Sequence, residues 1–233
     1  MRNTENISPV IREYLPFSSD DLHTILDANP FFPDSLIDFL DGLYPNIYHQ
    51  SVGVVENYTL RQHTYMVMNQ FEKYFSRLPL PGKIEMRYFR LFLAMHDIGK
   101  PDAIAQGNKY LQFQYNAAYI KKFFHSFGVD AKHTNLATAL ASGDPIGEFI
   151  LKRKTPLQTM KKIRQKAREA IMPVEDFFQL QCIFFQVDAG SYTRNAGGHY
   201  ALDKHFHFDE KNKKLAFAKH IQKRVDLLDF NVL

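Results

Sequence analysis

The sequence predicts an all-α protein with an N-terminal helical extension and a small C-terminal β-hairpin. Two observations lead to this prediction. Apolar residues recur at helical spacing along most of the 233 residues, and Gly, Pro and Asn residues divide these segments into helix-sized pieces. Hydrophobic residues make up 45% of the chain, which is enough for one sizeable core. We therefore expect one domain over 1–233, with a helical extension at 1–57, a helical core at 58–195 and a hairpin and helix at 196–233.

The extension contains two predicted helices. A helix start is predicted at residues 18–21, where two serines precede two aspartates, and a stop is predicted at residues 29–30, an Asn-Pro pair. A second helix over 34–43 carries leucines and an isoleucine on one face and ends before Pro45. The core then opens with a long helix from Thr59 to about Leu78, which places His63 on its apolar stripe.

The rest of the chain is organised around residues 91–101, LFLAMHDIGKP. An apolar helix predicted over 84–97 ends in His96 and Asp97, and Gly99 and Pro101 stop it. The carbonyl groups at a helix C-terminus carry about half a negative charge, which favours a bound cation there. Imidazole and carboxylate are both good metal ligands. We therefore predict a metal site at this helix end, followed by a polar loop over 99–108 that faces the substrate.

Five more helices are predicted beyond this motif. An aromatic-rich helix spans 109–127, a further helix spans 131–141, and a helix over 156–171 combines a narrow apolar stripe with many lysines and arginines. Pro173 opens the next helix, which is apolar almost throughout and stops at Gly190. A hairpin joining 204–209 to 215–217 and a closing helix over 217–229 complete the chain. The lone cysteine, Cys182, is predicted to be a buried small hydrophobe.

An acidic residue ends the apolar helix that Pro173 opens. Burying the Asp188 carboxylate without a partner would be expensive, and a metal ion, a lysine partner or an exposed helix end would each remove that cost. Asp144 is a second acidic candidate for the metal site. Because an Asp followed by Pro145 is typical of a helix N-cap, we prefer Asp188 as the ligand.

Residues 96–101, HDIGKP, resemble the central motif of the HD-domain superfamily of metal-dependent phosphohydrolases. The family pattern is an earlier His, the His-Asp pair and a later Asp, all on helices. His63, His96, Asp97 and Asp188 match these positions, and the resemblance covers roughly residues 58–195. It implies an HD-type helical domain in which these four side chains bind a divalent metal ion. Mn, Mg, Fe, Co, Ni and Zn all remain open as its identity.

The resemblance also implies a reaction. A bound divalent ion lowers the pKa of water from about 16 toward about 7 and polarises a phosphoryl oxygen, so the expected chemistry is hydrolysis of a phosphoester by a metal-activated water. The expected substrate is a nucleotide or another small phosphorylated metabolite. We expect Asp97 and Lys100 to be catalytic, and Lys100 and Arg194 to bind the substrate as positive charges. Arg194 lies in the segment 189–199, whose glycines and hydroxyls suit a substrate loop.

Further histidines remain open as ligands of a second ion. Many members of the superfamily place additional His ligands in the middle of the domain, where this chain has His125 and His133. His199 is a third candidate. His205 and His207 resemble a metal cluster by composition, but strand alternation explains them as well.

Three other functions are left open by the sequence. One alternative is a protein that binds a nucleotide without hydrolysing it. Another is a di-iron oxygenase with the HD fold, a class that requires more His ligands. The third alternative is an RNA-binding helical protein. The net charge of +4 and the basic segment over 152–168 favour anionic partners, although such a segment is usually a solvated helix face.

Location and partners follow from what the sequence lacks. Residues 1–6 have no apolar core of a signal peptide, no stretch approaches about 18 apolar residues, and the single cysteine cannot form an internal disulfide. We therefore expect a cytoplasmic protein with a small phosphorylated partner and no membrane association. Nucleic acid is a weaker candidate partner, and the oligomeric state stays open.

Overall fold

A computed structural model describes residues 18–53, 57–198, 200–228 and 230. Within these residues the chain is mostly helical and contains one two-stranded antiparallel sheet, so the predicted all-α fold with a small hairpin is confirmed. No helix in this part of the chain is long and apolar enough to span a bilayer.

Eleven α-helices and two strands are found in the described residues. In chain order they are α1 (Ser19–Leu26), α2 (Pro33–Leu43), α3 (Leu60–Tyr74), α4 (Met86–Met95), α5 (Lys100–Ala105), α6 (Gln112–Ser126), α7 (Ala131–Ala141), α8 (Pro145–Ile150), α9 (Pro156–Glu169), α10 (Val174–Gly190), β1 (Phe206–Asp209), β2 (Lys214–Phe217) and α11 (Lys219–Val225). Short 3₁₀ segments lie at Pro81–Lys83, Lys109–Leu111, Arg194–Ala196 and Tyr200–His205. The predicted helices are therefore present, although several are shorter: the helix expected over 59–78 ends at Tyr74.

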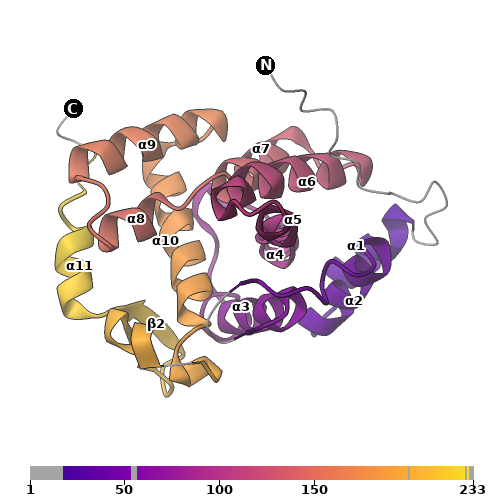
Figure 1. Ribbon diagram of the computed structural model, residues 1–233, viewed down its shortest axis with the longest axis horizontal. Coiled ribbons are helices and arrows are strands. Elements are labelled where there is room, and N and C mark those ends of the chain that lie inside the picture. Colours follow the sequence, from indigo (N-terminus) through magenta and orange to yellow (C-terminus); the bar gives the residue numbers. More distant parts are fainter. Residues whose placement is uncertain (1–17, 54–56, 199, 229, 231–233) are drawn as a thin grey trace.

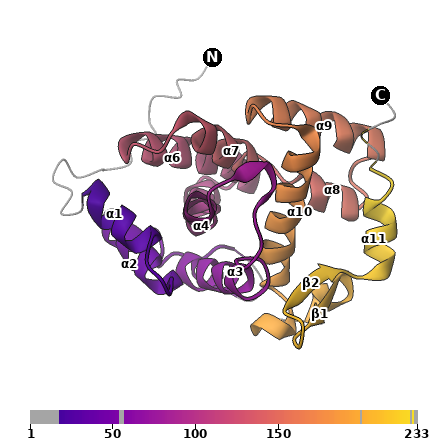
Figure 2. The ribbon, with the colours of Figure 1, turned by 180° about the vertical axis from the view of Figure 1, so that it is seen from behind.

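Helix α4 lies in the middle of the molecule. Figures 1 and 2 show it between α6 and α7 on one side and α2 and α3 on the other, with α10 next to this group. Its side chains from Leu91 to Met95 are all buried, so the C-terminal half of this helix has no polar face. The ring of Phe92 meets that of Phe184 on α10, with 4.8 Å between the ring centroids. A central helix of this kind fixes the position of whatever follows its last turn.

The N-terminal extension shares this core. Ser18 caps α1 through a capping box with Asp21, and the apolar side chains of α1 and α2 are part of the same buried cluster as those of α3 and α4. After α2, the hydroxyl of Tyr48 donates a buried hydrogen bond to the carbonyl oxygen of Ala94, at 2.9 Å. The extension thus holds α4 close to the turn where its metal-ligand candidates begin.

The segment expected to be a polar loop after α4 contains a helix. Lys100–Ala105 forms α5, and Pro101 lies in its first turn, where a missing N–H costs no hydrogen bond. The prediction of a loop over 99–108 was therefore wrong over these residues. It was wrong because a proline near a helix end is compatible both with the end of one helix and with the start of another. As a result, Lys100 is the first residue of a short helix, with Gly99 joining it to the end of α4.

Helix α10 carries the last ligand candidate and supports the C-terminal hairpin. It runs from Val174 to Gly190, and Asp188 lies in its final turn, as predicted. Strands β1 and β2 pair antiparallel with Phe206 opposite Phe217, and both rings lie about 6.1 Å from that of Phe185 on α10. Figure 2 shows the hairpin beside the C-terminal part of α10. Cys182 on α10 is half-buried and free, and burial raises the pKa of its thiol to about 12.

Candidate metal centre

Three helices bring four candidate ligands together at one point. His63 comes from α3, His96 and Asp97 follow α4, and Asp188 comes from the last turn of α10. His63 and His96 are 0% and 2% exposed. All four were predicted from the sequence as metal ligands, and the structure places them in one cluster.

The ligand atoms of this cluster lie close to one another. The Nε2 atoms of His63 and His96 are 3.1 Å apart, and the Oδ1 atom of Asp188 lies 3.1 Å from the first and 3.8 Å from the second. The Oδ2 atom of Asp97 lies 3.4 Å from His63 Nε2 and 3.8 Å from His96 Nε2. The ligand atoms of His63, His96 and Asp188 thus lie within 4.8 Å of one another, and Asp97 lies beside both imidazoles. Imidazole nitrogens and carboxylates are a donor set suited to a divalent ion with open coordination positions.

The other nitrogen of each imidazole has its own partner. Nδ1 of His96 lies 2.7 Å from the carbonyl oxygen of Leu93, which can only accept, so Nδ1 carries the proton and Nε2 presents a lone pair. Nδ1 of His63 lies 3.4 Å from the hydroxyl oxygen of Ser191, whose own hydrogen is donated to the carbonyl of Asp188 at 2.6 Å. For His63 the same assignment would leave the Nε2 lone pair free to bind an ion, but without an ion the nearby carboxylate oxygens of Asp188 and Asp97, which can only accept, favour a proton on Nε2. Either this proton or a cation removes the repulsion between the two Nε2 atoms, which are 3.1 Å apart.

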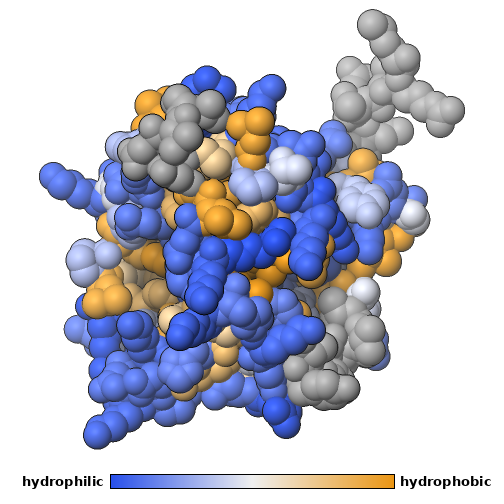
Figure 3. Space-filling view, turned by 90° about the vertical axis from the view of Figure 1, so that its left-hand side faces the viewer, coloured by the Kyte–Doolittle hydropathy of each residue, from blue (hydrophilic) through white to orange (hydrophobic). Residues whose placement is uncertain are grey.

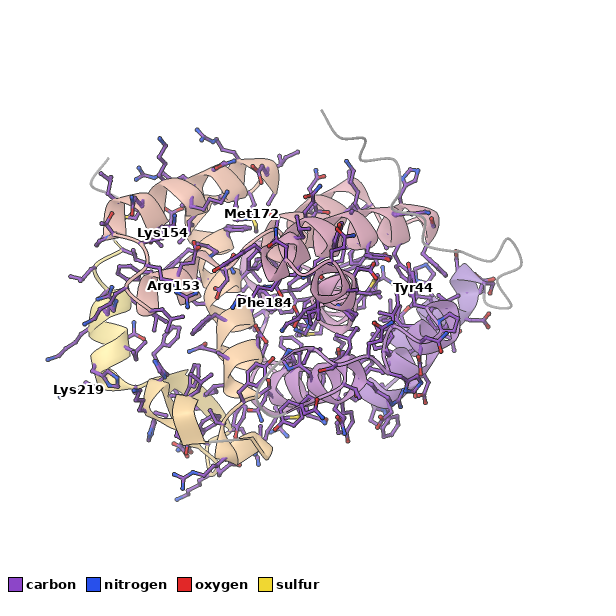
Figure 4. The ribbon with its side chains drawn as sticks, in the orientation of Figure 1. Tyr44, Arg153, Lys154, Met172, Phe184 and Lys219 are labelled. Carbon is purple, nitrogen blue, oxygen red and sulfur yellow. The ribbon has the colours of Figure 1, made fainter. Side chains whose placement is uncertain are left out.

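Aromatic rings fix both imidazoles in place. The ring of Tyr192 stacks on His63 with 4.8 Å between centroids, and the Tyr192 hydroxyl lies 3.3 Å from His63 Nε2. The ring of Phe184 meets His96 edge to face at 5.6 Å. Figure 4 labels Phe184 on α10 where that helix faces α4. Because both ligands are packed on a ring and hydrogen-bonded through Nδ1, little side-chain freedom is left to lose when an ion binds.

The cluster has unusual protonation equilibria. Burial opposes protonation of His63, but hydrogen bonds and charge from Asp188 and Asp97 outweigh it, so the pKa of His63 is raised. For His96 burial dominates and its pKa is lowered. Burial also opposes ionisation of Asp97, yet the positive charge of Lys100, together with both histidines, holds its pKa well below the usual range. The carboxylate is therefore ionised throughout the physiological range.

Lys100 lies at the edge of the cluster. Its Nζ atom is 2.9 Å from Asp97 Oδ2, and the pKa of the ammonium is raised because the attraction of Asp97 exceeds the cost of burial. Gly99 positions this lysine by donating its N–H to the side-chain oxygen of Asn116 on α6, at 2.7 Å. A permanent positive charge next to the metal-ligand candidates suits the contact with an anionic substrate that the sequence predicts.

The structure does not bring the remaining predicted residues into the cluster. Arg194 has a side chain that is 73% exposed and pairs with Asp203. Asp144 caps α8 by accepting the N–H of Gly147 at 2.8 Å, as its sequence context indicates. Neither residue takes part in the contacts among the four candidate ligands.

The additional histidines also lie apart from the cluster. His125 is exposed near the end of α6, and His133 uses Nδ1 on Asp130 and Nε2 on the N–H of Glu85. His207 is exposed on β1, and His199 lies outside the described residues. In the part of the chain that the structure describes, the cluster thus holds two histidines.

The basic helix α9 is not a uniformly solvated face. Lys161, Lys162 and Arg168 are exposed, but Arg164 donates a hydrogen bond to the carbonyl of Phe230 at 2.8 Å. Lys166 is 1% exposed. The sequence interpretation of these five cations as an open basic surface is therefore wrong for Lys166, which weakens the case for an extended RNA contact.

Ser191 and Tyr192 belong to the site but were not singled out in the sequence. The signal that points to them is spacing, since they follow Asp188 by three and four residues and so lie about one helical turn beyond it. Only the loop that contains them was expected to face a substrate. The contact of His96 with a backbone carbonyl has no counterpart in the sequence.

Comparisons of the chain with models of protein families, with curated proteins and with solved structures find no match. The resemblance of residues 96–101 to the HD-domain motif therefore stays a prediction. It is supported by the motif itself and by the meeting of the four matched side chains.

Divalent ions are expected to stabilise the folded chain. An ion that binds only the folded state at one hundred times its Kd adds about 2.7 kcal/mol, which corresponds to a rise in Tm of roughly 5–10 °C for a chain of this size. Calorimetry of EDTA-treated protein with Mn²⁺ or Zn²⁺ added measures the effect. His63→Ala is expected to lose the rise, and an unchanged Tm with every candidate ion would contradict a metal centre.

The histidine pair is expected to contribute to the stability of the metal-free protein a term that is greatest near pH 6.5, the ordinary histidine pKa. This term is the difference between the wild type and a histidine variant, because the shifted pKa values of Asp144 and Lys166 add their own pH dependence. The raised pKa of His63 contributes stability that is complete below about pH 6.5 and is lost as the pH rises through the raised value. The lowered pKa of His96 acts in the opposite direction, because below about pH 6.5 the unfolded chain takes up the proton first. Urea unfolding in EDTA at a series of pH values on both sides of pH 6.5 measures how the free energy of unfolding changes in each direction. His63→Gln should remove the decline above pH 6.5, and His96→Gln the decline below it.

Proposed function

We propose that this chain is a metal-dependent phosphohydrolase that acts on a nucleotide or another small phosphorylated metabolite. The observation that carries the proposal is the meeting of two imidazoles and the Asp188 carboxylate from three helices, with Asp97 and Lys100 beside them. The resemblance to the HD-domain motif supports the same reaction class. A divalent ion held by these side chains supplies Lewis acidity toward a phosphoryl oxygen and lowers the pKa of a water molecule.

Each of the chain's own residues has a role in this proposal. His63, His96, Asp97 and Asp188 hold the ion, and the hydrogen bonds of Leu93 and Ser191 keep the imidazole lone pairs directed at it. Lys100 offsets the negative charge that accumulates on the phosphoryl oxygens during reaction, while Asp97 holds its ammonium in place.

The alternatives from the sequence receive less support. An HD-fold di-iron site needs more histidines than the two that the described cluster contains, and His133 is committed to Asp130. RNA binding by α9 would rely on cations of which Arg164 and Lys166 are engaged within the protein. Nucleotide binding without turnover uses the same groups as hydrolysis, so activity is the discriminating measurement.

The test is to measure bound metal and hydrolysis on the same samples. Purified protein is analysed for metals, stripped with EDTA, and reloaded separately with Mn²⁺, Mg²⁺, Fe²⁺, Co²⁺, Ni²⁺ and Zn²⁺, and release of phosphate from a panel of nucleotides and sugar phosphates is followed. The proposal expects about one ion or more per chain and hydrolysis that depends on reloading. Stoichiometric metal without hydrolysis of any substrate would favour the binding protein, and absence of metal under all conditions would overturn the metal centre.

A further inference from the structure

A second feature of the molecule is a pocket of about 380 Å³ between the start of α6, the start of α8 and helix α9. Three lysines line it: Lys154 from the segment before α9, and Lys162 and Lys166 from α9 itself. Figure 4 labels Lys154 between α8 and α9, and Figure 3 shows that the side of the molecule carrying α9 and α11 is largely hydrophilic. None of these lysines belongs to the metal centre.

Lys166 is the unusual member of this group. It is 1% exposed, and its Nζ atom donates to the carbonyl oxygen of Ala139, at 3.0 Å, and to the hydroxyl of Ser142. Both acceptors are neutral, and among the described residues no carboxylate forms an ion pair with this ammonium. An ammonium has three N–H donors, so one is left for the pocket. Gly143 leaves that side open, because a Cβ there would lie 3.7 Å from Nζ.

A buried, unpaired cation is costly to maintain. Burial lowers the pKa of Lys166 to about 8, so at neutral pH it still carries a charge in most molecules. A methionine of similar length would fill the same space without that cost. An anionic partner that enters the pocket would stabilise the buried Lys166 ammonium and so offset the cost of its burial.

The acidic residues of the pocket do not cancel this charge. Asp144 and Glu148 also line it, but Asp144 already accepts the N–H of Gly147, and burial raises its pKa to about 7. Burial therefore weakens the negative charge of Asp144 near neutral pH. Three lysines against two carboxyl groups leave the pocket with an excess of positive charge.

The pocket lies next to the metal centre. The charge of Asp188 adds to the raised pKa of Asp144, so the two carboxyl groups are within electrostatic reach of each other. On α6, Phe113 lines the pocket, and Asn116, one turn further along the same face, holds Gly99 beside Lys100. The pocket and the centre are thus connected through α6 and through Asp144.

We propose that this lysine pocket binds a second, non-reacting phosphate of the substrate, so that the substrate class is small molecules with two separate phosphate groups. This inference rests on the proposed function for the identity of the reacting phosphate. The lysines recognise the remote phosphate, the metal centre takes the phosphate that is hydrolysed, and Phe113 supplies an apolar part of the pocket lining.

The first test measures phosphate binding without metal. Inorganic phosphate is titrated calorimetrically into the EDTA-treated full chain, its Lys166→Met variant and its Lys161→Met variant. Lys161 is the matched control, because it is an exposed lysine of the same helix that does not line the pocket. We expect binding to be at least about tenfold weaker in Lys166→Met, the loss of one charged hydrogen bond, and unchanged in Lys161→Met. No binding by the wild type, or equal binding by all three proteins, overturns the pocket.

The second test uses metal-loaded protein and compares a nucleoside bisphosphate with the matching nucleoside monophosphate. Lys166→Met should raise KM about tenfold for the bisphosphate, with kcat and the monophosphate kinetics unchanged. Thermal unfolding of Lys166→Met, expected at or above the wild-type Tm, separates this effect from misfolding. Lys162 is an exposed lysine that also lines the pocket, so Lys162→Met should change KM in the same direction. Equal effects on both substrates overturn the inference. If the lysines bind phosphate but the protein hydrolyses none of the substrates, the proposed function is overturned and the phosphate site is still supported.

Discussion

His96→Ala is expected to remove both the bound metal and the hydrolytic activity. His96 contributes one of the two imidazole nitrogens that lie 3.1 Å apart, and its position is fixed by Leu93 and by the ring of Phe184. Changes to the residues that merely support a ligand already cost about 10–100-fold in metal affinity, so removal of the ligand itself should cost at least about 100-fold. Loss of the ion's charge should lower kcat on the order of 10³-fold or more.

The matched control for this variant is His125→Ala. His125 is an exposed histidine on α6 that does not touch the cluster, so metal content and kcat should stay at wild-type levels. Elemental analysis and phosphate release are measured on both variants, with circular dichroism in EDTA to establish that each is folded. A folded His96→Ala protein that retains stoichiometric metal and full activity would show that the ion, if there is one, binds elsewhere.

Gly99→Ala is expected to have the largest effect on stability. A Cβ at this position would lie 2.4 Å from the Cβ of Tyr115 and 2.7 Å from the backbone nitrogen of Asn116, so α6 would have to move away from the turn between α4 and α5. Overpacking against a backbone that cannot yield costs about 3 kcal/mol, which lowers the Tm of a chain of this size by roughly 6–12 °C. The shift would also displace Asp97 and Lys100, so metal affinity should fall.

Gly107→Ala is the control for this substitution. Gly107 has a φ of +70° but nothing within 4 Å of an added Cβ, so the cost is only the left-handed backbone conformation, about 1 kcal/mol. Urea unfolding of both variants gives the two free energies. Equal destabilisation, or a Gly99→Ala variant as stable as the wild type, would mean that the close approach of α6 is not required.

The sequence alone predicted the ligand cluster but not its surroundings. His63, His96, Asp97 and Asp188 were predicted as ligands because they match the residue types and order of the HD-domain motif, and the helices that carry them follow from apolar periodicity. These are local signals. The hydrogen bonds that orient the imidazoles, by contrast, involve a backbone carbonyl and a hydroxyl that any helix end supplies, so no pattern of residue types marks them.

Two errors in the sequence interpretation have physical reasons. The helix α5 was missed because Pro101 stops one helix and starts the next with the same chemistry. Lys166 was placed on the surface because its two acceptors come from the end of α7 and the residue after it, far away in the sequence. The first error has a local cause, whereas the second depends on tertiary partners that a local pattern does not reveal.

The positions of the ligands along the chain also set the order in which the centre is assembled. His63 and His96 leave the ribosome long before Asp188, and the hydroxyl of Ser191 that orients His63 comes later still. A nascent chain that ends before α10 thus holds both imidazoles and the Asp97 carboxylate but lacks the third helix. An ion held by the complete set of ligands would therefore bind only after α10 has been synthesised and packed against α4.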